Sequence, residues 1–240
     1  MKKLFALLLA LTMLVAFAGC NNDTLPEGVM THAEFEAAAM DSEVTVHTYL
    51  QAVESWWDGC VQIYAQSKDG AYYIYNLACT EEEAAKLVPG TKIEVKGYKA
   101  EWSGEVEITD ATYKILKGSY IVKDAFDVTS LMGTDGLTAH MNELVAVKGL
   151  TVAASKDAEG NDVPFLYKWD GSGSQGDDIY FNVSLGDKTY TFTVNAYMIG
   201  IEETYKAVEA LKIGDKIDIE GFLYWYNGAQ PHVTAVKPAK

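Results

Sequence analysis

The chain has 240 residues, with 34 acidic side chains against 19 cationic ones and a formal net charge of −15. Every cation is a lysine, because the sequence contains no arginine. Proteins that bind nucleic acid neutralise phosphates with clustered Lys and Arg, and Arg is the preferred bidentate partner of phosphate and guanine. The composition therefore disfavours a nucleic-acid partner and predicts an acidic, well-solvated surface.

The first nineteen residues have the layout of a secretory signal peptide. Lys2 and Lys3 precede an apolar run over residues 4–17, and two small residues come directly before Cys20. The run is short for a membrane span. The stretch LVAFAGC resembles the lipobox of bacterial lipoproteins.

This resemblance implies cleavage after residues 1–19 and lipidation of Cys20. A plain secretory signal cut elsewhere and a transmembrane anchor are the alternatives. Residues 20–30 are polar and turn-rich, as expected of a tether. A multiply acylated cysteine holds a protein firmly to a membrane, so we expect an extracytoplasmic, lipid-anchored protein whose membrane contact is Cys20.

Residues 31–118 have the pattern of a small domain built from strands. Alternating apolar residues predict strands, and a Thr followed three residues later by Glu predicts the start of a short helix. In chain order, we expect a helix over 31–41, a strand over 43–53, a hairpin over 60–79, a helix from Thr80, and strands over 91–98 and 105–116.

Cys60 and Cys79 lie at equal distances from the dipeptide Asp69-Gly70. Asp-Gly favours a two-residue hairpin turn, and that register places the two cysteines opposite each other. A disulfide is one interpretation, since exported compartments permit disulfides, and two small buried apolar residues are the other. Opposed residues at this position would be a hydrogen-bonded pair, with the wider Cα separation.

The second half of the chain, residues 119–240, repeats this plan. LVPGTKIEVKGY at 87–98 recurs as LKIGDKIDIEGF at 211–222. A first strand is expected over 143–153 and a second hairpin around Gly186-Asp187. The polar, glycine-rich stretch between them is an insertion without a counterpart in the first half.

Five strands with a helix between the third and the fourth are the plan of the OB-fold, a small Greek-key barrel. The shared pattern L-x-x-G-x-K-I-x-[VI]-x-G-[YF] resembles exported OB-fold proteins. We therefore expect an all-β chain with short helices, in which a lipoprotein signal peptide precedes two tandem five-stranded OB-like barrels. The resemblance concerns shape, because this barrel hosts many unrelated functions.

Aromatic residues gather where OB-folds meet ligands, on strands two and three and in the loops joining strands one to two and four to five. They offer flat platforms for sugar rings, bases or partner side chains, but aromatic residues also fill barrel cores. For Tyr64, Tyr73 and Tyr75 the core interpretation is favoured. The candidate ligand-binding residues are Trp56, Trp57, Trp102, Tyr73, Tyr75, Trp169, Trp225 and Tyr226.

The sequence carries no pattern of an enzyme or a metal site. The four histidines, at positions 32, 47, 140 and 232, are scattered over different elements, and neither a nucleophile-elbow serine nor an HExxH motif occurs. The run DAEGND lacks the spacing of a calcium loop. We expect a non-catalytic module without cofactor that binds a glycan or a protein partner at the cell envelope. An oligonucleotide-binding lipoprotein and a structural spacer are the alternatives.

Overall fold

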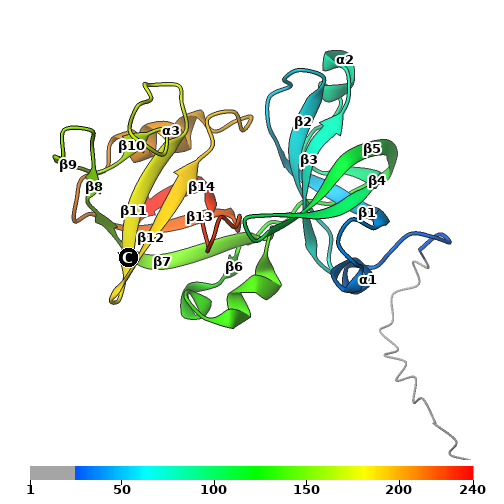
Figure 1. Ribbon diagram of the computed structural model, residues 1–240, viewed down its shortest axis with the longest axis horizontal. Helices are drawn as coiled ribbons and strands as arrows, with labels where there is room; N and C mark the ends of the chain where they lie inside the picture. The colour runs from blue at the N-terminus through cyan, green and yellow to red at the C-terminus, as the bar shows by residue number, and fades with distance from the viewer. Residues whose placement is uncertain (1–24, 240) are drawn as a thin grey trace, which may run out of the picture.

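The computed structural model describes residues 25–239, which form two five-stranded β-barrels joined by a short connection (Figure 1). The predicted signal peptide (1–19), Cys20 and residues 21–24 of the predicted tether lie outside these residues. Within the described part of the chain, no helix has the length and apolar character needed to cross a membrane.

The first barrel closes in the strand order β1-β2-β3-β5-β4. All neighbouring strands are antiparallel except β3 and β5, which run parallel. Its elements are α1 (His32–Ala37), β1 (Glu43–Val53), β2 (Cys60–Gln66), β3 (Ala71–Ala78), α2 (Glu81–Ala84), β4 (Thr91–Trp102) and β5 (Glu105–Ser119).

The second barrel closes in the equivalent order β7-β11-β12-β14-β13, again with one parallel pair, β12 and β14. Its ring consists of β7 (Leu144–Ala153), β11 (Ile179–Leu185), β12 (Lys188–Val194), β13 (Lys216–Phe222) and β14 (His232–Pro238), with α3 (Glu202–Glu209) between β12 and β13. Both rings have the OB-fold plan, so the prediction of two tandem OB-like barrels is confirmed.

Shorter elements decorate the second barrel. Strand β6 (Phe126–Asp127) adds to β7, and two 3₁₀ helices, Thr129–Leu131 and Asp135–His140, follow it. The predicted insertion contains β8 (Ser155–Lys156), β9 (Asp162–Val163) and β10 (Leu166–Tyr167). It leaves the barrel between its first and second strands, as the sequence repeat indicates.

The repeated motif marks the same structural point in both barrels. Gly97 in β4 and Gly221 in β13 each lie where the backbone of the fifth strand approaches closely. A Cβ at Gly97 would lie 2.6 Å from the carbonyl oxygen of Thr109, and one at Gly221 would lie 2.4 Å from that of His232. Pairing in both ladders is irregular beside the glycine. The glycines therefore permit the tight curl of the barrel wall.

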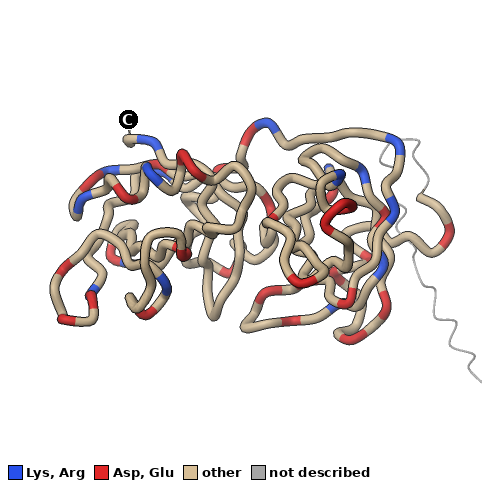
Figure 2. The backbone as a smooth tube through the Cα atoms, turned by 90° about the horizontal axis from the view of Figure 1, so that it is seen from above, with Lys and Arg blue, Asp and Glu red and all other residues tan. Residues whose placement is uncertain are grey.

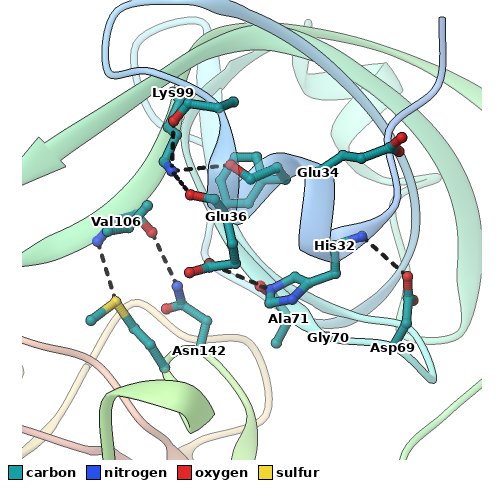
Figure 3. A network of polar contacts seen from close by, with 12 residues as sticks. His32, Glu34, Glu36, Asp69, Gly70, Ala71, Lys99, Val106 and Asn142 are labelled. Carbon is teal, nitrogen blue, oxygen red and sulfur yellow. Dashed lines mark hydrogen bonds and ion pairs between the residues drawn. The ribbon is translucent and has the colours of Figure 1, made fainter. Parts of the chain in front are cut away.

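Helix α1 packs on the first barrel through Phe35, whose ring lies edge-on to Tyr72 at 5.0 Å. The buried side chain of Lys99 on β4 satisfies the end of this helix. Its Nζ donates to the carbonyl oxygens of Phe35 (3.0 Å), Glu36 (2.7 Å) and Ala38 (3.1 Å), as Figure 3 shows. The carbonyl of Phe35 also accepts from the N–H of Ala38 at 3.1 Å. The lysine adds donors to the carbonyls at the C-terminal end of this short helix, so it both stabilises the helix end and joins it to β4.

The first hairpin departs from its predicted register. The turn takes four residues, with Gln66 opposite Ala71, and an irregularity between Val61 and Ile63 shifts the pairing again. As a result Cys60 lies opposite Ala78 rather than Cys79, and both cysteines are free thiols. The interpretation as a disulfide is therefore not supported, because the four-residue turn shifts the register by two residues and the irregularity beside Val61 restores only one of them.

Candidate ligand-binding site

The β2–β3 face of the first barrel is covered by the second barrel. Tyr64 is 1% exposed and stacks on Phe222 at 4.5 Å, with an angle of 8° between the rings. Its hydroxyl lies 2.9 Å from Nδ1 of His232. Tyr73 is buried as well, edge-on to Tyr224 at 5.5 Å. The assignment of Tyr73 to ligand binding is therefore wrong, because this tyrosine packs between the barrels.

Hydrogen bonds around these aromatics fix the barrels relative to each other. The segments that follow β1 and β12 are joined directly, since the backbone N–H of Ser55 donates to the carbonyl of Tyr197 at 2.8 Å. The side chain of Gln66 accepts from the N–H of Leu144 at 3.0 Å. The amide of Asn195 donates to Glu54 at 2.7 Å. The two barrels thus share a rim of hydrogen bonds around an aromatic centre.

Three acidic residues are buried near this interface. Burial raises the pKa of Glu54 to about 7, that of Glu105 to about 8 and that of Glu107 to about 7, because desolvation disfavours the charged form. Oε2 of Glu105 accepts from the backbone N–H of Trp225 at 2.7 Å.

The second oxygen of Glu105 and the amide oxygen of Asn142 are both buried acceptors that lack a donor in the described residues. The amide nitrogen of Asn142 is committed to the carbonyl of Val106, 3.2 Å away (Figure 3). A neutral Glu105 carries the hydroxyl donor that these two acceptors lack. Protonation of Glu105, the direction in which burial raises its pKa, would therefore give both atoms a hydrogen-bond partner.

The corresponding face of the second barrel, β11–β12, is open and forms a cleft of about 690 Å³, referred to below as the main cleft. Its walls come from both strands, the insertion, the loop between β13 and β14, and the β4–β5 turn of the first barrel. The lining residues are Trp102, Ser155, Lys156, Leu166, Trp169, Asp178, Tyr180, Asn182, Thr191, Thr193, Tyr224, Tyr226, Gln230 and His232.

Alternation along the two strands separates core from cleft. On β11, Phe181 points into the barrel core while Tyr180 and Asn182 line the cleft. On β12, Thr191 and Thr193 line the cleft in the same way. A polar floor thus lies on the side where the first barrel has aromatic residues.

The floor of the main cleft includes an unsatisfied polar atom. Oγ1 of Thr193 is buried and has no hydrogen-bond partner within the described chain. Beside it in the ladder lies His232, whose ring stacks on Tyr224 at 4.4 Å. Burial lowers the pKa of this histidine to about 3, so the ring is neutral near physiological pH. A ligand hydroxyl could satisfy the threonine.

Two exposed indoles line the cleft. Trp169 is 70% exposed and lies in a tight turn that begins with Lys168 in the left-handed region (φ 60°) and ends where Asp170 accepts from the N–H of Ser172 at 3.0 Å. Trp102 is 62% exposed and ends strand β4 of the first barrel. One barrel therefore supplies an aromatic wall for the cleft of the other.

The main cleft carries little charge. Of its lining residues only Lys156 and Asp178 are ionisable at neutral pH, and Lys156 is already paired with Asp162 at 2.8 Å. Burial raises the pKa of Asp178. Figure 2 shows acidic residues along the loops of both barrels with lysines scattered among them. The described residues form no basic track leading to the cleft.

The structure brings only some of the predicted residues together. Trp102, Trp169 and Tyr226 line the main cleft, and Trp225 lines a neighbouring cavity. The others lie at the β1–β2 loop and on β3: Trp56, whose Nε1 donates to the carbonyl of Cys79 at 2.9 Å, Trp57, which is 80% exposed, and Tyr75, which is 40% exposed. These three belong to neither cavity.

The polar half of the cleft was not predicted from the sequence. It consists of Asn182, Thr191, Thr193, Gln230 and His232. A signal existed for the strand residues. In IYFNV and TYTFTV the core positions are aromatic or aliphatic, and the alternate positions include an amide and two hydroxyls. Short polar residues on a strand face opposite its core mark a surface that another apolar layer does not cover.

Comparison with known proteins gives only distant matches. No family model and no curated protein matches the chain. Similar solved structures include a murine DNA-binding protein bound to double-stranded DNA, with 10% identity, a TM-score of 0.36 and coverage of 82% of this chain and 96% of that one.

The tetrameric p202 HIN2 matches with 11% identity and a TM-score of 0.35, over 84% of this chain and 96% of that one. A replication protein A heterotrimer bound to single-stranded DNA has 8% identity and a TM-score of 0.28, over 88% and 69%. At these values none of the matches indicates what the present chain binds.

Proposed function

We propose that the protein is a non-catalytic binding module whose main cleft takes an uncharged saccharide. The observation that carries this proposal is the pairing of two exposed indoles, Trp102 and Trp169, with an uncharged polar floor. Sugar rings have apolar faces that cover aromatic rings and hydroxyls that both donate and accept hydrogen bonds. The side chains of Asn182, Gln230 and Thr193 can do the same in return.

The volume and shape of the main cleft support this proposal. A space of about 690 Å³ is within the range of sites that bury most of a small ligand. The unsatisfied hydroxyl of Thr193 at its floor gives a ligand hydroxyl a partner that is already desolvated. Such a bond gains more than a surface one, because the buried group has lost its water without compensation.

A single-stranded oligonucleotide is the second candidate. The main cleft lies on the strand two–three face and between the two loops that OB-folds use for oligonucleotides as well as oligosaccharides, and its indoles could stack bases. Phosphates would meet one lysine that is already paired and a protein of net charge −15. The charge therefore favours the saccharide.

We further propose that the protein is attached to the outer face of a membrane through lipidated Cys20. The basis is the signal-peptide layout and the residues LVAFAGC. Replacing Cys20 with Ser should prevent incorporation of radiolabelled palmitate and move the protein from the membrane fraction to the soluble fraction. Unchanged labelling and fractionation of the Cys20→Ser variant would contradict the anchor.

Calorimetric titration with a panel of neutral oligosaccharides tests the function of the cleft. Trp102→Ala and Trp169→Ala should each weaken binding by about 5- to 150-fold, taking about 1–3 kcal/mol for one stacked ring. Trp57→Ala is the matched control, because this tryptophan is 80% exposed but lies outside the main cleft.

Salt separates the two candidate ligands. Saccharide affinity should be nearly independent of salt concentration, while oligonucleotide affinity should fall steeply as salt increases. Binding of an oligonucleotide with such a salt dependence, together with no binding of any neutral sugar, would replace the first candidate with the second. A protein that binds neither a neutral sugar nor an oligonucleotide would contradict both candidate functions.

A further inference from the structure

We propose that the ligand is an unbranched chain that continues past Tyr226 into a second compartment. This inference rests on the proposed function, since it extends the same site. The second compartment is a cavity of about 470 Å³ on the other side of the β13–β14 loop. It shares three lining residues with the main cleft, Thr191, Tyr226 and Gln230. The two cavities are therefore adjacent, with Tyr226 between them.

The second compartment repeats the chemistry of the first. Trp225 and Tyr190 supply aromatic surface, and hydroxyls and an amide come from Thr134, Thr138, Thr189 and Asn227. Its one ionisable group at neutral pH is Asp135. A ligand that stacks rings and exchanges neutral hydrogen bonds in the main cleft would find the same kind of partners here. A repeating polymer presents the same groups at intervals, so it matches a repeated site.

Residues 225–227 of the β13–β14 loop form a ridge between the two compartments. This ridge is held in place before any ligand arrives. The backbone N–H of Trp225 is bound by Glu105, and that of Asn227 donates to the carbonyl of Ser103 at 2.7 Å. The ring of Trp225 covers Gly104, where a Cβ would lie 2.7 Å from its Cδ1. All three partners belong to the first barrel, so the first barrel positions the ridge. A preformed ridge reduces the ordering cost of binding.

The opposite wall of the second compartment is also tied down. Nζ of Lys188 donates to the carbonyl of Gly133 at 3.0 Å, which links the 3₁₀ segment to β12. Each compartment is large enough to hold a small ligand by itself. A chain that fills both should therefore bind more tightly than one that fills the main cleft alone, and the gain should appear when the chain is long enough to pass Tyr226.

The experiment compares chain lengths on the folded protein with a blocking substitution. The probes are unbranched glucose and N-acetylglucosamine oligomers from the disaccharide to the octasaccharide. Thr189→Trp places a large ring at an exposed strand position that lines only the second compartment. The control is Thr112→Trp, at an exposed strand position of the first barrel outside both cavities.

We expect affinity to rise about ten-fold or more between short and long oligomers, the gain from roughly one additional stacked ring. Thr189→Trp should remove that gain and leave disaccharide binding unchanged, while Thr112→Trp should change neither. Affinity that does not depend on length, or a Thr189→Trp variant that keeps the full gain, would overturn the inference alone. Failure of every oligomer to bind would overturn the proposed function and this inference with it.

Discussion

The β2–β3 face of the first barrel and the β11–β12 face of the second occupy the same place in the same fold and have opposite roles. The first presents Tyr64 and Tyr73, which are buried against the second barrel. The second presents Asn182, Thr191 and Thr193, which line the main cleft. Large aromatic rings gain by leaving water, whereas short polar groups lose their hydration, so side-chain chemistry decides which face becomes an interface.

The comparison also shows how the copies depend on each other. The β2–β3 face of the first barrel is buried against the second barrel. This packing places the β4–β5 turn of the first barrel beside the cleft of the second. Trp102 and the contacts of Ser103 and Glu105 with the β13–β14 loop all come from this turn. The two similar barrels thus build one composite cleft rather than two equivalent ones.

The largest effect is expected from Tyr64→Ala, which removes the centre of the interface. Replacing a fully buried aromatic residue costs about 3–5 kcal/mol, and this one also gives up its contact with His232. Urea unfolding followed by circular dichroism gives the free energy of unfolding. Asn182→Ala on the open face is the matched control and should cost about 1 kcal/mol. Equal losses at the two positions would contradict the difference between the faces.

A smaller, pH-dependent effect is expected from the buried acids of the interface. Their folded pKa values, about 7 for Glu54, 8 for Glu105 and 7 for Glu107, lie above the ordinary value of 4.5. Between these values the folded state holds protons that the unfolded state releases. The stability that these protons contribute is therefore fully present below the ordinary pKa and is lost as pH rises through the pKa values of the folded state. The loss is at most about 1.4 kcal/mol per pH unit for each carboxyl.

The free energy of unfolding measured across this pH window tests the assignment. Glu105→Gln keeps an acceptor for the N–H of Trp225 and supplies a permanent donor for Asn142, so its stability should depend less on pH than that of the natural protein. Glu43→Gln, at an exposed residue of β1, is the control and should leave the slope unchanged. The free energy of unfolding of Glu105→Gln could instead vary with pH as steeply as that of the natural protein. That result would show that the Glu105 carboxyl is charged over the whole pH window.

The smallest effect concerns the two hairpins, of which only the first contains cysteines. With free thiols at Cys60 and Cys79, a reductant should change the free energy of unfolding by less than about 0.5 kcal/mol. A disulfide closing a loop of this size would contribute about 3 kcal/mol. Thiol titration of the purified protein in denaturant provides the independent check. Loss of both thiols, with a large reductant effect, would mean that the hairpin adopts the two-residue turn.

Local patterns were enough to predict the barrels. Gly97 and Gly221 mark equivalent curls, and the pair Gly186-Asp187 marks a two-residue turn between Leu185 and Lys188. The turn at Asp69-Gly70 was placed correctly, but its register was not. The register depends on a turn of four residues in place of two and on a bulge beside Ile63. Alternation reveals neither, because the longer turn leaves each side chain on the same face and the bulge changes the pattern only locally.

The site was predicted only in part, because its composition depends on packing between the barrels. Tyr73 and Trp102 have the same appearance in sequence, an aromatic residue at a typical OB ligand position. The packing of the second barrel against the β2–β3 face buries Tyr73 beside Tyr224 and leaves Trp102 at the border of the cleft. His232 is a single histidine outside any sequence motif. Its place in the lining of the cleft likewise depends on how the first barrel packs against the second.

The junction of α1 with β4 through Lys99 has a mechanical consequence. The chain enters the fold at this end, where Met30 bridges to Val46 of β1 before α1 begins. A load on the proposed lipid anchor would therefore pass into β1 through this bridge and into β4 through α1 and Lys99. The cleft lies on the barrel farther along the chain, whose C-terminus is far from α1 in Figure 1. The first barrel would then act as a pedestal. It would bear the attachment and hold the barrel with the proposed binding cleft away from the anchored end of the chain.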